Sequence, residues 1–187
     1  MNRWILTTAL ALALAAGVPG AEAKNTLRWS SQGDALTADP HAQNEGPTNS
    51  FNLTVHEPLL YRNRDMKLEP ALALSWKTLN ATTWEFKLRR GVVFHDGTKF
   101  TADDVVFSFK RAQMPSSDHR NSLDTIADVK KIDDYTVHFV TRAPNPILPN
   151  QITQIAVMSK AWAEKHKVAK PQDYKNKEET YAVRNAM

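Results

Sequence analysis

The sequence predicts a mixed α/β domain, and three observations support this. Residues 83–89 (TWEFKLR) alternate apolar and charged side chains, as a half-buried antiparallel strand does. Residues 101–112 combine an N-terminal capping pattern with apolar residues on one helical face. The chain is 42% apolar and 24% charged, which is typical of a globular protein and argues against a disordered or fibrous one.

The first 23 residues have the pattern of an export signal. Arg3 supplies a positive start, residues 4–16 are mostly apolar, and residues 21–23 (AEA) form a small-x-small cleavage site. The apolar run is shorter than the roughly 20 residues that a membrane span needs. We therefore predict a signal peptide over residues 1–23, a mature chain that starts at Lys24, and a periplasmic location. A retained signal anchor is the alternative.

The absence of cysteine narrows the function further. It argues against disulfide scaffolds, thiolate metal sites and a cysteine nucleophile. A lipoprotein would need a cysteine at its cleavage site, so we predict an exported protein without a lipid anchor. The formal net charge is +4 at pH 7 with basic residues spread along the chain, which gives little support for nucleic-acid binding.

A strand and a short helix are predicted before residue 60. Residues 26–31 (TLRWSS) alternate in the manner of a strand. Thr48 or Asn49 then caps a short helix that runs toward Leu59, and Pro58 within it should end or bend the helix because proline cannot continue a helical hydrogen-bond ladder.

The middle of the chain is predicted to form hairpins. Residues 61–65 form a turn, and a strand at residues 76–79 is joined by a tight turn to the strand at residues 83–89. Asp96 and Gly97 supply the positive φ angles of a further hairpin turn.

The clearest helix signal begins at Thr101. This residue is the predicted N-cap, and Asp104 three residues later completes a variant capping box. Ala102, Val105 and Phe109 then fall on one face of the helix. After this helix the predicted elements are, in order, two strands joined by an aspartate turn, a third strand and a short helix, at residues 126–132, 135–141, 154–158 and 159–166.

The residues show no pattern that indicates catalysis. Two histidines, His95 and His119, each neighbour an aspartate as in a catalytic dyad, but we interpret them as surface histidines beside turn aspartates. His56 and Glu57 lack a third ligand for a metal site. We therefore predict a protein that is not an enzyme and that carries no cofactor and no metal.

Residues 84–108 (WEFKLRRGVVFHDGTKFTADDVVFS) resemble the signature of a known family. This is the peptide/nickel family of ABC-transporter solute-binding proteins, also called family 5. Three upstream segments resemble family landmarks in the same order, at residues 36–41 (LTADPH), 57–61 (EPLLY) and 69–76 (EPALALSW). The resemblance covers residues 27–141 well and the remainder loosely.

The resemblance implies a fold and a function. Family members are periplasmic binding proteins of type II, whose two lobes close around a solute. Residues 24–53 would begin ligand-binding lobe I, and residues 54–187 would form the family's extra α/β domain of that lobe. The implied role is the solute-binding component of an ABC importer that captures di- or oligopeptides or a similar small solute. The implied partners are this ligand and an inner-membrane permease, with the protein a monomer that binds no nucleic acid.

By position, the resemblance also assigns residues to the ligand cleft. They lie at the end of the first strand and in the loop before the predicted helix: Ser31, Gln32, Glu45, Gly46, Pro47 and Thr48. Glu45 is a candidate partner for a cationic group of the ligand, while plain solvation is the simpler interpretation. The ligand itself stays open, because this family binds peptides, nickel complexes, haem, opines and sugars on one scaffold.

Members of the family are far longer than 187 residues. We therefore expect this chain to be an N-terminal fragment that stops before lobe II, and to bind peptide weakly or not at all by itself. An exported enzyme or a stand-alone interaction module that merely shares the signature is the alternative. A third possibility is a chaperone-like use of exposed apolar surface.

Overall fold

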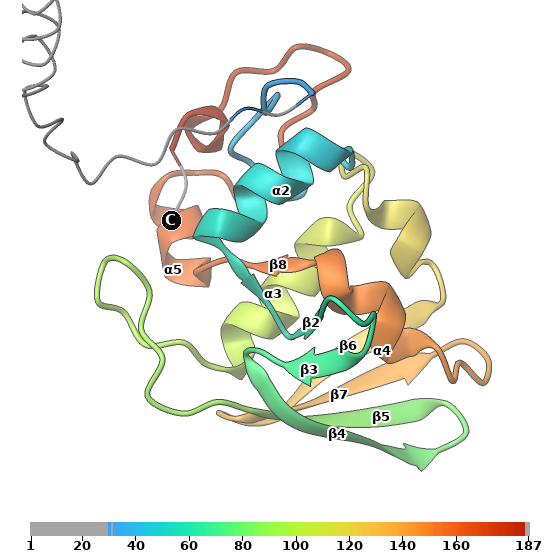
Figure 1. Cartoon of the computed structure of the whole chain (residues 1–187). Helices are drawn as coiled ribbons and strands as arrows, with labels where there is room; N and C mark the ends of the chain where they lie inside the picture. Colours follow the sequence, from blue (N-terminus) through green and yellow to red (C-terminus); the bar gives the residue numbers. More distant parts are fainter. Residues whose placement is uncertain (1–29, 31, 186–187) are drawn as a thin grey trace, which may run out of the picture. The chain divides into compact units, whose positions relative to one another are not determined.

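Four antiparallel strands form a sheet along one side of the described unit, and a helix packs against it (Figure 1). The computed structural model describes Ser30 and residues 32–185, and a compact unit begins at Gln32. The predicted signal peptide and most of the predicted strand at residues 26–31 lie outside the described residues. The mixed α/β class predicted from the sequence is confirmed.

The central sheet has the strand order β4-β5-β7-β6. Two hairpins build it: β4 pairs with β5 and β6 pairs with β7, and the pairing of β5 with β7 joins the two hairpins. Both predicted hairpins are confirmed, although the first strand begins three residues earlier than expected. The strand bounds are β4 (Ala73–Asn80), β5 (Thr83–Leu88), β6 (Ile126–Asp133) and β7 (Thr136–Thr141).

The core lies between this sheet and helix α3 (Ala102–Ala112). Phe86 of β5 and Phe109 of α3 both meet Phe139 of β7 in edge-to-face contacts, with ring centroids 5.0 and 4.7 Å apart. Such aromatic pairs add about 0.5–1.5 kcal/mol each to the burial of their surface. Glu85 and Lys87 alternate with these buried residues on the opposite face of β5, so the predicted alternation is confirmed.

Helix α3 begins as predicted. Thr101 is its N-cap and Asp104 completes the capping box, since one carboxylate oxygen of Asp104 accepts from the Thr101 backbone N–H at 2.9 Å. The other oxygen accepts from the Lys160 backbone N–H at 2.9 Å, at the start of α5 (Lys160–Lys165). Burial raises the pKa of Asp104 above its ordinary value. One carboxylate therefore joins the beginnings of two helices.

Helix α2 (Gly46–Val55) differs from the prediction at both ends. Its N-cap is Glu45 rather than Thr48 or Asn49, because the Glu45 carboxylate accepts from the Thr48 backbone N–H at 2.8 Å and Pro47 sits in the first turn. The helix also ends before Pro58, which lies in the short strand β1 (Glu57–Pro58). This strand pairs antiparallel with β8 (Ala156–Val157).

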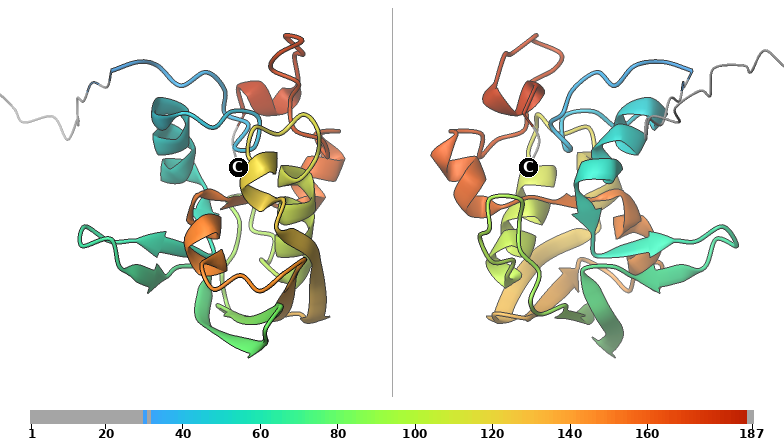
Figure 2. Two further views of the ribbon diagram at one scale, coloured as in Figure 1. Left: turned by 90° about the vertical axis from the view of Figure 1, so that its right-hand side faces the viewer. Right: turned by 60° about the vertical axis from the view of Figure 1, so that its left-hand side comes forward.

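Strands β2 (Leu60–Arg62) and β3 (Leu68–Pro70) form a hairpin that projects from the body (Figure 2). The turn predicted at residues 61–65 is therefore wrong in its first half. The turn itself forms around Asn63, whose side-chain oxygen accepts from the backbone N–H groups of Asp65 and Lys67 at 2.9 and 3.0 Å. The Asn63 side chain thus supplies the hydrogen-bond acceptor for two backbone N–H groups of the turn.

The Asp96-Gly97 turn is confirmed with one change. Gly97 adopts a φ of 82° and its N–H bonds the Phe94 carbonyl at 2.8 Å, whereas Asp96 keeps a negative φ. The remaining elements are short and cover the edge of the core: η1 (Arg120–Leu123), α4 (Leu148–Gln151), η2 (Ile152–Gln154) and η3 (Tyr181–Val183).

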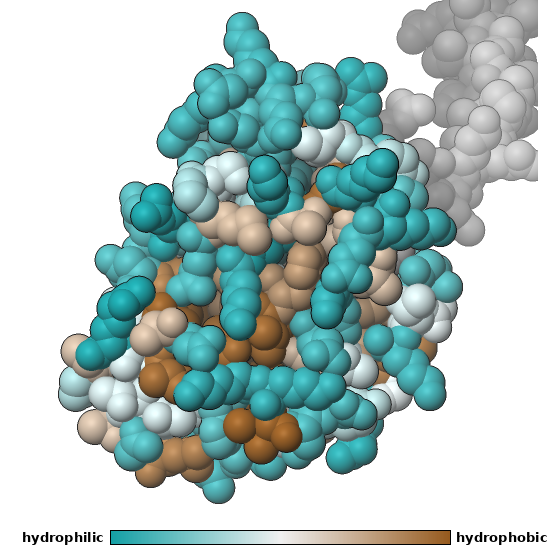
Figure 3. All heavy atoms as spheres, turned by 180° about the vertical axis from the view of Figure 1, so that it is seen from behind, coloured by the Kyte–Doolittle hydropathy of each residue, from teal (hydrophilic) through white to brown (hydrophobic). Residues whose placement is uncertain are grey.

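The surface of this unit is mostly hydrophilic on the face seen from behind, where apolar residues show mainly in the lower half (Figure 3). Within the described part of the chain, every helix is too short or too polar to cross a bilayer.

Candidate functional site

The predicted ligand residues that the structure describes lie at the surface around the start of α2. Gln32 is exposed, Gly46 is exposed, and Glu45 and Pro47 are half-buried. Thr48 is fully buried, and its hydroxyl accepts from the Leu36 backbone N–H at 2.9 Å. Ser31 lies outside the described residues. The assignment of these residues to a ligand cleft stays a prediction.

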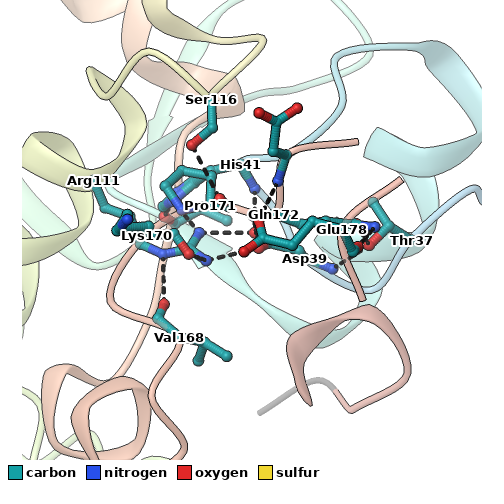
Figure 4. Close-up of polar contacts among 12 residues, drawn as sticks. Thr37, Asp39, His41, Arg111, Ser116, Val168, Lys170, Pro171, Gln172 and Glu178 are labelled. Carbon is teal, nitrogen blue, oxygen red and sulfur yellow. Dashed lines mark hydrogen bonds and ion pairs between the residues drawn. The ribbon is translucent and has the colours of Figure 1, made fainter. Parts of the chain in front are cut away.

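The structure also contains a buried polar cluster that the sequence did not reveal (Figure 4). We call it the Arg111 clasp and define it as Thr37, Asp39, His41, Arg111 and Gln172. It joins the segment before α2 to helix α3 and to the C-terminal segment at residues 168–172.

Arg111 uses all five of its N–H donors in the clasp. Its two terminal nitrogens donate to the two carboxylate oxygens of Asp39, each at 2.7 Å, as a bidentate pair. The remaining donors reach His41 Nδ1 at 3.0 Å and the carbonyls of Val168 and Lys170 at 3.1 and 2.8 Å. Both charged side chains have an exposed fraction of 0%.

Asp39 is equally well satisfied. Besides the guanidinium, it accepts from the backbone N–H groups of Gln172 at 2.9 Å and His41 at 3.1 Å. Burial works to raise the pKa of Asp39, but the hydrogen bonds and charge of Arg111 outweigh it and hold that pKa below its ordinary value. Thr37 closes the cluster, since its hydroxyl donates to the Gln172 side-chain oxygen at 2.9 Å.

His41 is held in one tautomer by its two neighbours. Nδ1 faces an arginine donor and must accept, whereas Nε2 lies 2.9 Å from the Ala156 carbonyl and must donate. Burial and the nearby charge of Arg111 hold the pKa of His41 well below its ordinary value. The ring is therefore neutral at neutral pH.

His119 packs edge-on against His41, with ring centroids 6.3 Å apart. It has an exposed fraction of 1%, so the prediction of a surface histidine is wrong for His119, whereas His95 is exposed as expected. Burial lowers the pKa of His119. The error arose because the polar residues around it in sequence suggested a solvated loop.

A weak sequence signal for the clasp does exist on α3. Asp104, Ser108 and Arg111 follow one another at i, i+4 and i+7 and are all buried. A polar stripe beside an apolar stripe ordinarily faces solvent, so the spacing alone does not distinguish a second contact face from a solvated one. It cannot name the partner, because Asp39 lies 72 residues away in sequence.

Unlike the groups of the Arg111 clasp, the buried side chain of His56 lacks hydrogen-bond partners. His56 has an exposed fraction of 5%, and neither of its ring nitrogens has a hydrogen-bond partner; the side-chain oxygen of Asn52, one turn earlier on α2, has none either. Burial lowers the pKa of His56 to about 4. His56 and His95 line a small pocket of about 120 Å³ whose other walls are mostly apolar. Among the described residues, no group of three metal-ligand side chains is close enough to hold an ion.

An open pocket of about 470 Å³ lies next to residues of the clasp. Two of its charged groups pair with each other, since Lys175 lies 3.5 Å from Asp118, and Gln43 donates to the same carboxylate at 3.0 Å. The walls come from three segments: Ala42, Gln43, Met114, Pro115, Ser116, Asp118, Lys170, Asp173, Tyr174, Lys175 and Asn176. Such a polar recess suits a small polar ligand and contains no nucleophile–base pair.

Fold and site together define a class: an α/β domain whose buried charged groups are paired with one another. Comparison with known proteins then gives the family. The model of the bacterial extracellular solute-binding proteins, family 5 (middle region) matches residues 67–183, which is well over half of the chain. This chain belongs to that family.

Individual relatives agree with this assignment. The periplasmic oligopeptide-binding protein OppA of Escherichia coli K12 is 31% identical over 157 residues, which covers 74% of this chain and 29% of OppA. The probable ABC transporter periplasmic-binding protein SapA of the same organism is 35% identical over 131 residues, or 58% of this chain and 23% of SapA.

A solved structure also matches. The binding protein AgaA from A. tumefaciens R10, in complex with agropinic acid, superposes with a TM-score of 0.67 and 28% identity, covering 72% of this chain and 28% of AgaA. The chain thus spans less than a third of the length of these relatives. Proteins of this family bind solutes and do not catalyse reactions, in agreement with the prediction that this is not an enzyme.

Proposed function

We propose that this chain is part of the solute-binding component of an ABC importer that captures peptides or similar small solutes in the periplasm. The observation that carries the proposal is the family match over residues 67–183. The names of OppA and SapA add peptide binding, the periplasm and an ABC transporter. An inner-membrane permease is the partner that such a role requires, and residues 1–23 would direct export.

Within this proposal the two parts of the chain have different tasks. Residues 24–53 begin the ligand-binding lobe, and residues 54–187 form the extra domain that supports it. The Arg111 clasp favours this division of labour, because it anchors residues 37–41 to α3 only four residues before the loop at Glu45. A ligand-contacting loop profits from such an anchor, since less flexibility is lost when the ligand binds.

The candidate ligand residues are Gln32, Glu45, Gly46, Pro47 and Thr48, together with Ser31. Glu45 uses one carboxylate oxygen to cap α2 and accepts there from Thr48. The negative carboxylate at this position would still attract a cationic group such as a peptide amino terminus. The ligand class remains the finer part of the proposal, because AgaA is described with agropinic acid and OppA as an oligopeptide-binding protein.

Titration of the ¹⁵N-labelled chain with trialanine, followed by amide NMR shifts, tests the proposed contact surface. We expect weak binding with shifts that concentrate at Gln32 and residues 45–48. The Glu45→Gln variant keeps the capping oxygen and should bind the peptide more weakly, whereas Asp118→Asn in the open polar pocket should bind it unchanged. Shifts that appear only around Asp118, and not at Gln32 or residues 45–48, would overturn the assignment of the loop.

The transport role has its own test. Sequencing of the genomic region around codon 187 should show an in-frame continuation followed by permease and ATPase genes. A stop codon with no transporter genes nearby would contradict the importer proposal. Isothermal titration with mixed di- to pentapeptides completes the test, since micromolar affinity of the 187-residue chain would refute the expectation that it binds peptide weakly.

A further inference from the structure

We propose that His41 makes the Arg111 clasp an acid-sensitive latch, which holds residues 37–41 against α3 at neutral pH and releases them when His41 takes up a proton. All contacts of the latch lie within the described residues, and the latch would act in the same way whichever solute the protein binds.

The hydrogen bonds of His41 leave no place for a second proton. Nε2 already donates to the Ala156 carbonyl, so the added proton has to go to Nδ1. Nδ1 lies 3.0 Å from a terminal nitrogen of Arg111 that donates to it. After protonation two N–H donors would point at each other and two positive charges would lie side by side.

The charged and titratable groups around His41 do not relieve this conflict. Arg111 from α3 is a permanent cation, and the ring of His119 lies edge-on at 6.3 Å. Asp39 is the anion whose charge acts on His41 among the leading influences on the ring, and its two oxygens already accept from Arg111, Gln172 and the His41 backbone. The charge of Asp39 favours the imidazolium, while burial, Arg111 and His119 oppose it.

Water does not relieve it either. His41, Asp39 and Arg111 each have an exposed fraction of 0%. A buried imidazolium without an acceptor is costly, so the protonated ring must reach solvent. Since His41 sits in the segment at residues 37–41, this requires the segment to leave α3 and the carbonyl of Ala156.

The sign of the effect follows from the two states of the latch. A free histidine has a pKa near 6.5, and the clasped ring has one well below that. The open form therefore binds more protons, and acid favours opening from about pH 6.5 downward. For one such histidine the opening equilibrium rises roughly 25-fold between pH 7 and pH 5.

Amide hydrogen exchange of the whole chain, corrected for intrinsic rates, measures this opening at pH 7 and pH 5. We expect the hydrogen-bonded amides of Ala38, Asp39, His41 and Ala42 to open roughly 25-fold more at pH 5 from His41 alone. In His41→Gln the amide oxygen and nitrogen replace the acceptor and the donor without titrating, so most of this acid response should disappear. His138→Gln, which changes a half-buried histidine on the sheet surface, should respond as the unmodified chain does.

An equal acid response in the unmodified chain and in His41→Gln would overturn the proposal. If His41→Gln does not fold, ¹⁵N NMR of the His41 ring in the unmodified chain tests the proposal instead, because it reports the tautomer and the protonation of the ring. The latch requires a neutral ring with the proton on Nε2 that stays neutral in the closed form to pH 5. A His41 ring that titrates near pH 6.5 while residues 37–41 stay protected would refute it.

Discussion

Two groups of charged side chains in this protein use the same chemistry in opposite surroundings. In the Arg111 clasp, a bidentate pair at 2.7 Å is completely buried. On the outer face of the sheet, Glu85 lies 3.5 Å from Lys77, 3.7 Å from Lys87 and 3.3 Å from His138. We call this second group the Glu85 ladder; its two lysine side chains are 68% and 51% exposed.

The difference shows how burial changes the contribution of a charge pair to stability. In the ladder, hydrogen bonding to His138 and the charges of Lys87 and Lys77 lower the pKa of Glu85. Water competes for the lysines, however, so each pair contributes little. In the clasp no water competes, so the loss of either partner leaves the other charge stranded. Buried pairs are thus expensive to break, although they are not for that reason a large net gain in stability.

Removal of the clasp arginine should have the largest effect. Arg111→Ala leaves the Asp39 carboxylate buried without a counter-ion, so the free energy of unfolding at pH 7 should fall by about 3–5 kcal/mol. Urea unfolding followed by circular dichroism measures it. Lys87→Ala in the ladder is the matched control and should cost less than about 1 kcal/mol. Similar losses of unfolding free energy in the two variants would contradict the expected difference between the buried and the exposed charge pairs.

The double variant Asp39→Leu with Arg111→Met sharpens the same point. It removes both charges together, so it should be less destabilised than Arg111→Ala alone. A double variant that is as unstable as the sum of the two single changes would show that packing, rather than the stranded charge, dominates the clasp.

Lowering the pH should destabilise the protein through His56, a buried histidine that belongs to neither the clasp nor the ladder. His56 has a pKa of about 4 in the folded protein against about 6.5 when unfolded, so the unfolded chain binds more protons between these values. The cost of burying this histidine is smallest above pH 6.5 and grows as pH falls toward 4, so stability is lost over that range by up to about 3 kcal/mol. Urea unfolding at pH 7 and pH 4.5 should show a smaller acid loss in His56→Leu. An equal loss in both chains would contradict the assignment to His56.

At pH 7 the same substitution should stabilise the protein. Both ring nitrogens of His56 are buried without partners, and leucine removes these orphaned groups from an otherwise apolar pocket. We expect a gain of about 1–2 kcal/mol in the free energy of unfolding. His95→Leu lines the same pocket from an exposed position and should change stability by less than about 0.5 kcal/mol. A destabilised His56→Leu would show that the imidazole has a partner in solution.

The smallest effect is expected in the ladder. Glu85→Gln removes the central charge while keeping a hydrogen-bond acceptor beside His138. The loss should be below about 1 kcal/mol at low salt and should vanish near 1 M NaCl, because exposed pairs are screened. Thermal unfolding at the two salt concentrations measures it. A loss that does not respond to salt would show that the charge pairs of Glu85, like the pair in the clasp, are shielded from the solvent.

Local patterns allowed a good part of the fold to be predicted. The alternation around Phe86 and the capping box at Thr101 were confirmed, since both depend on residues within a few positions of one another. The start of α2 was missed, because Glu45 is a less common cap than threonine or asparagine. The ligand residues around Glu45 came from the family resemblance and stay a prediction.

The sequence by itself determined the class of this protein, its main hairpins, the central helix and, through the signature at residues 84–108, its family. Only the tertiary structure decided which polar residues are buried and with whom. Asp39 and Arg111 are 72 residues apart, and His41 meets a carbonyl 115 residues away. A hydrogen bond over such a separation leaves no periodic trace in the chain, because it depends on where the packed elements bring distant segments together rather than on their local conformation.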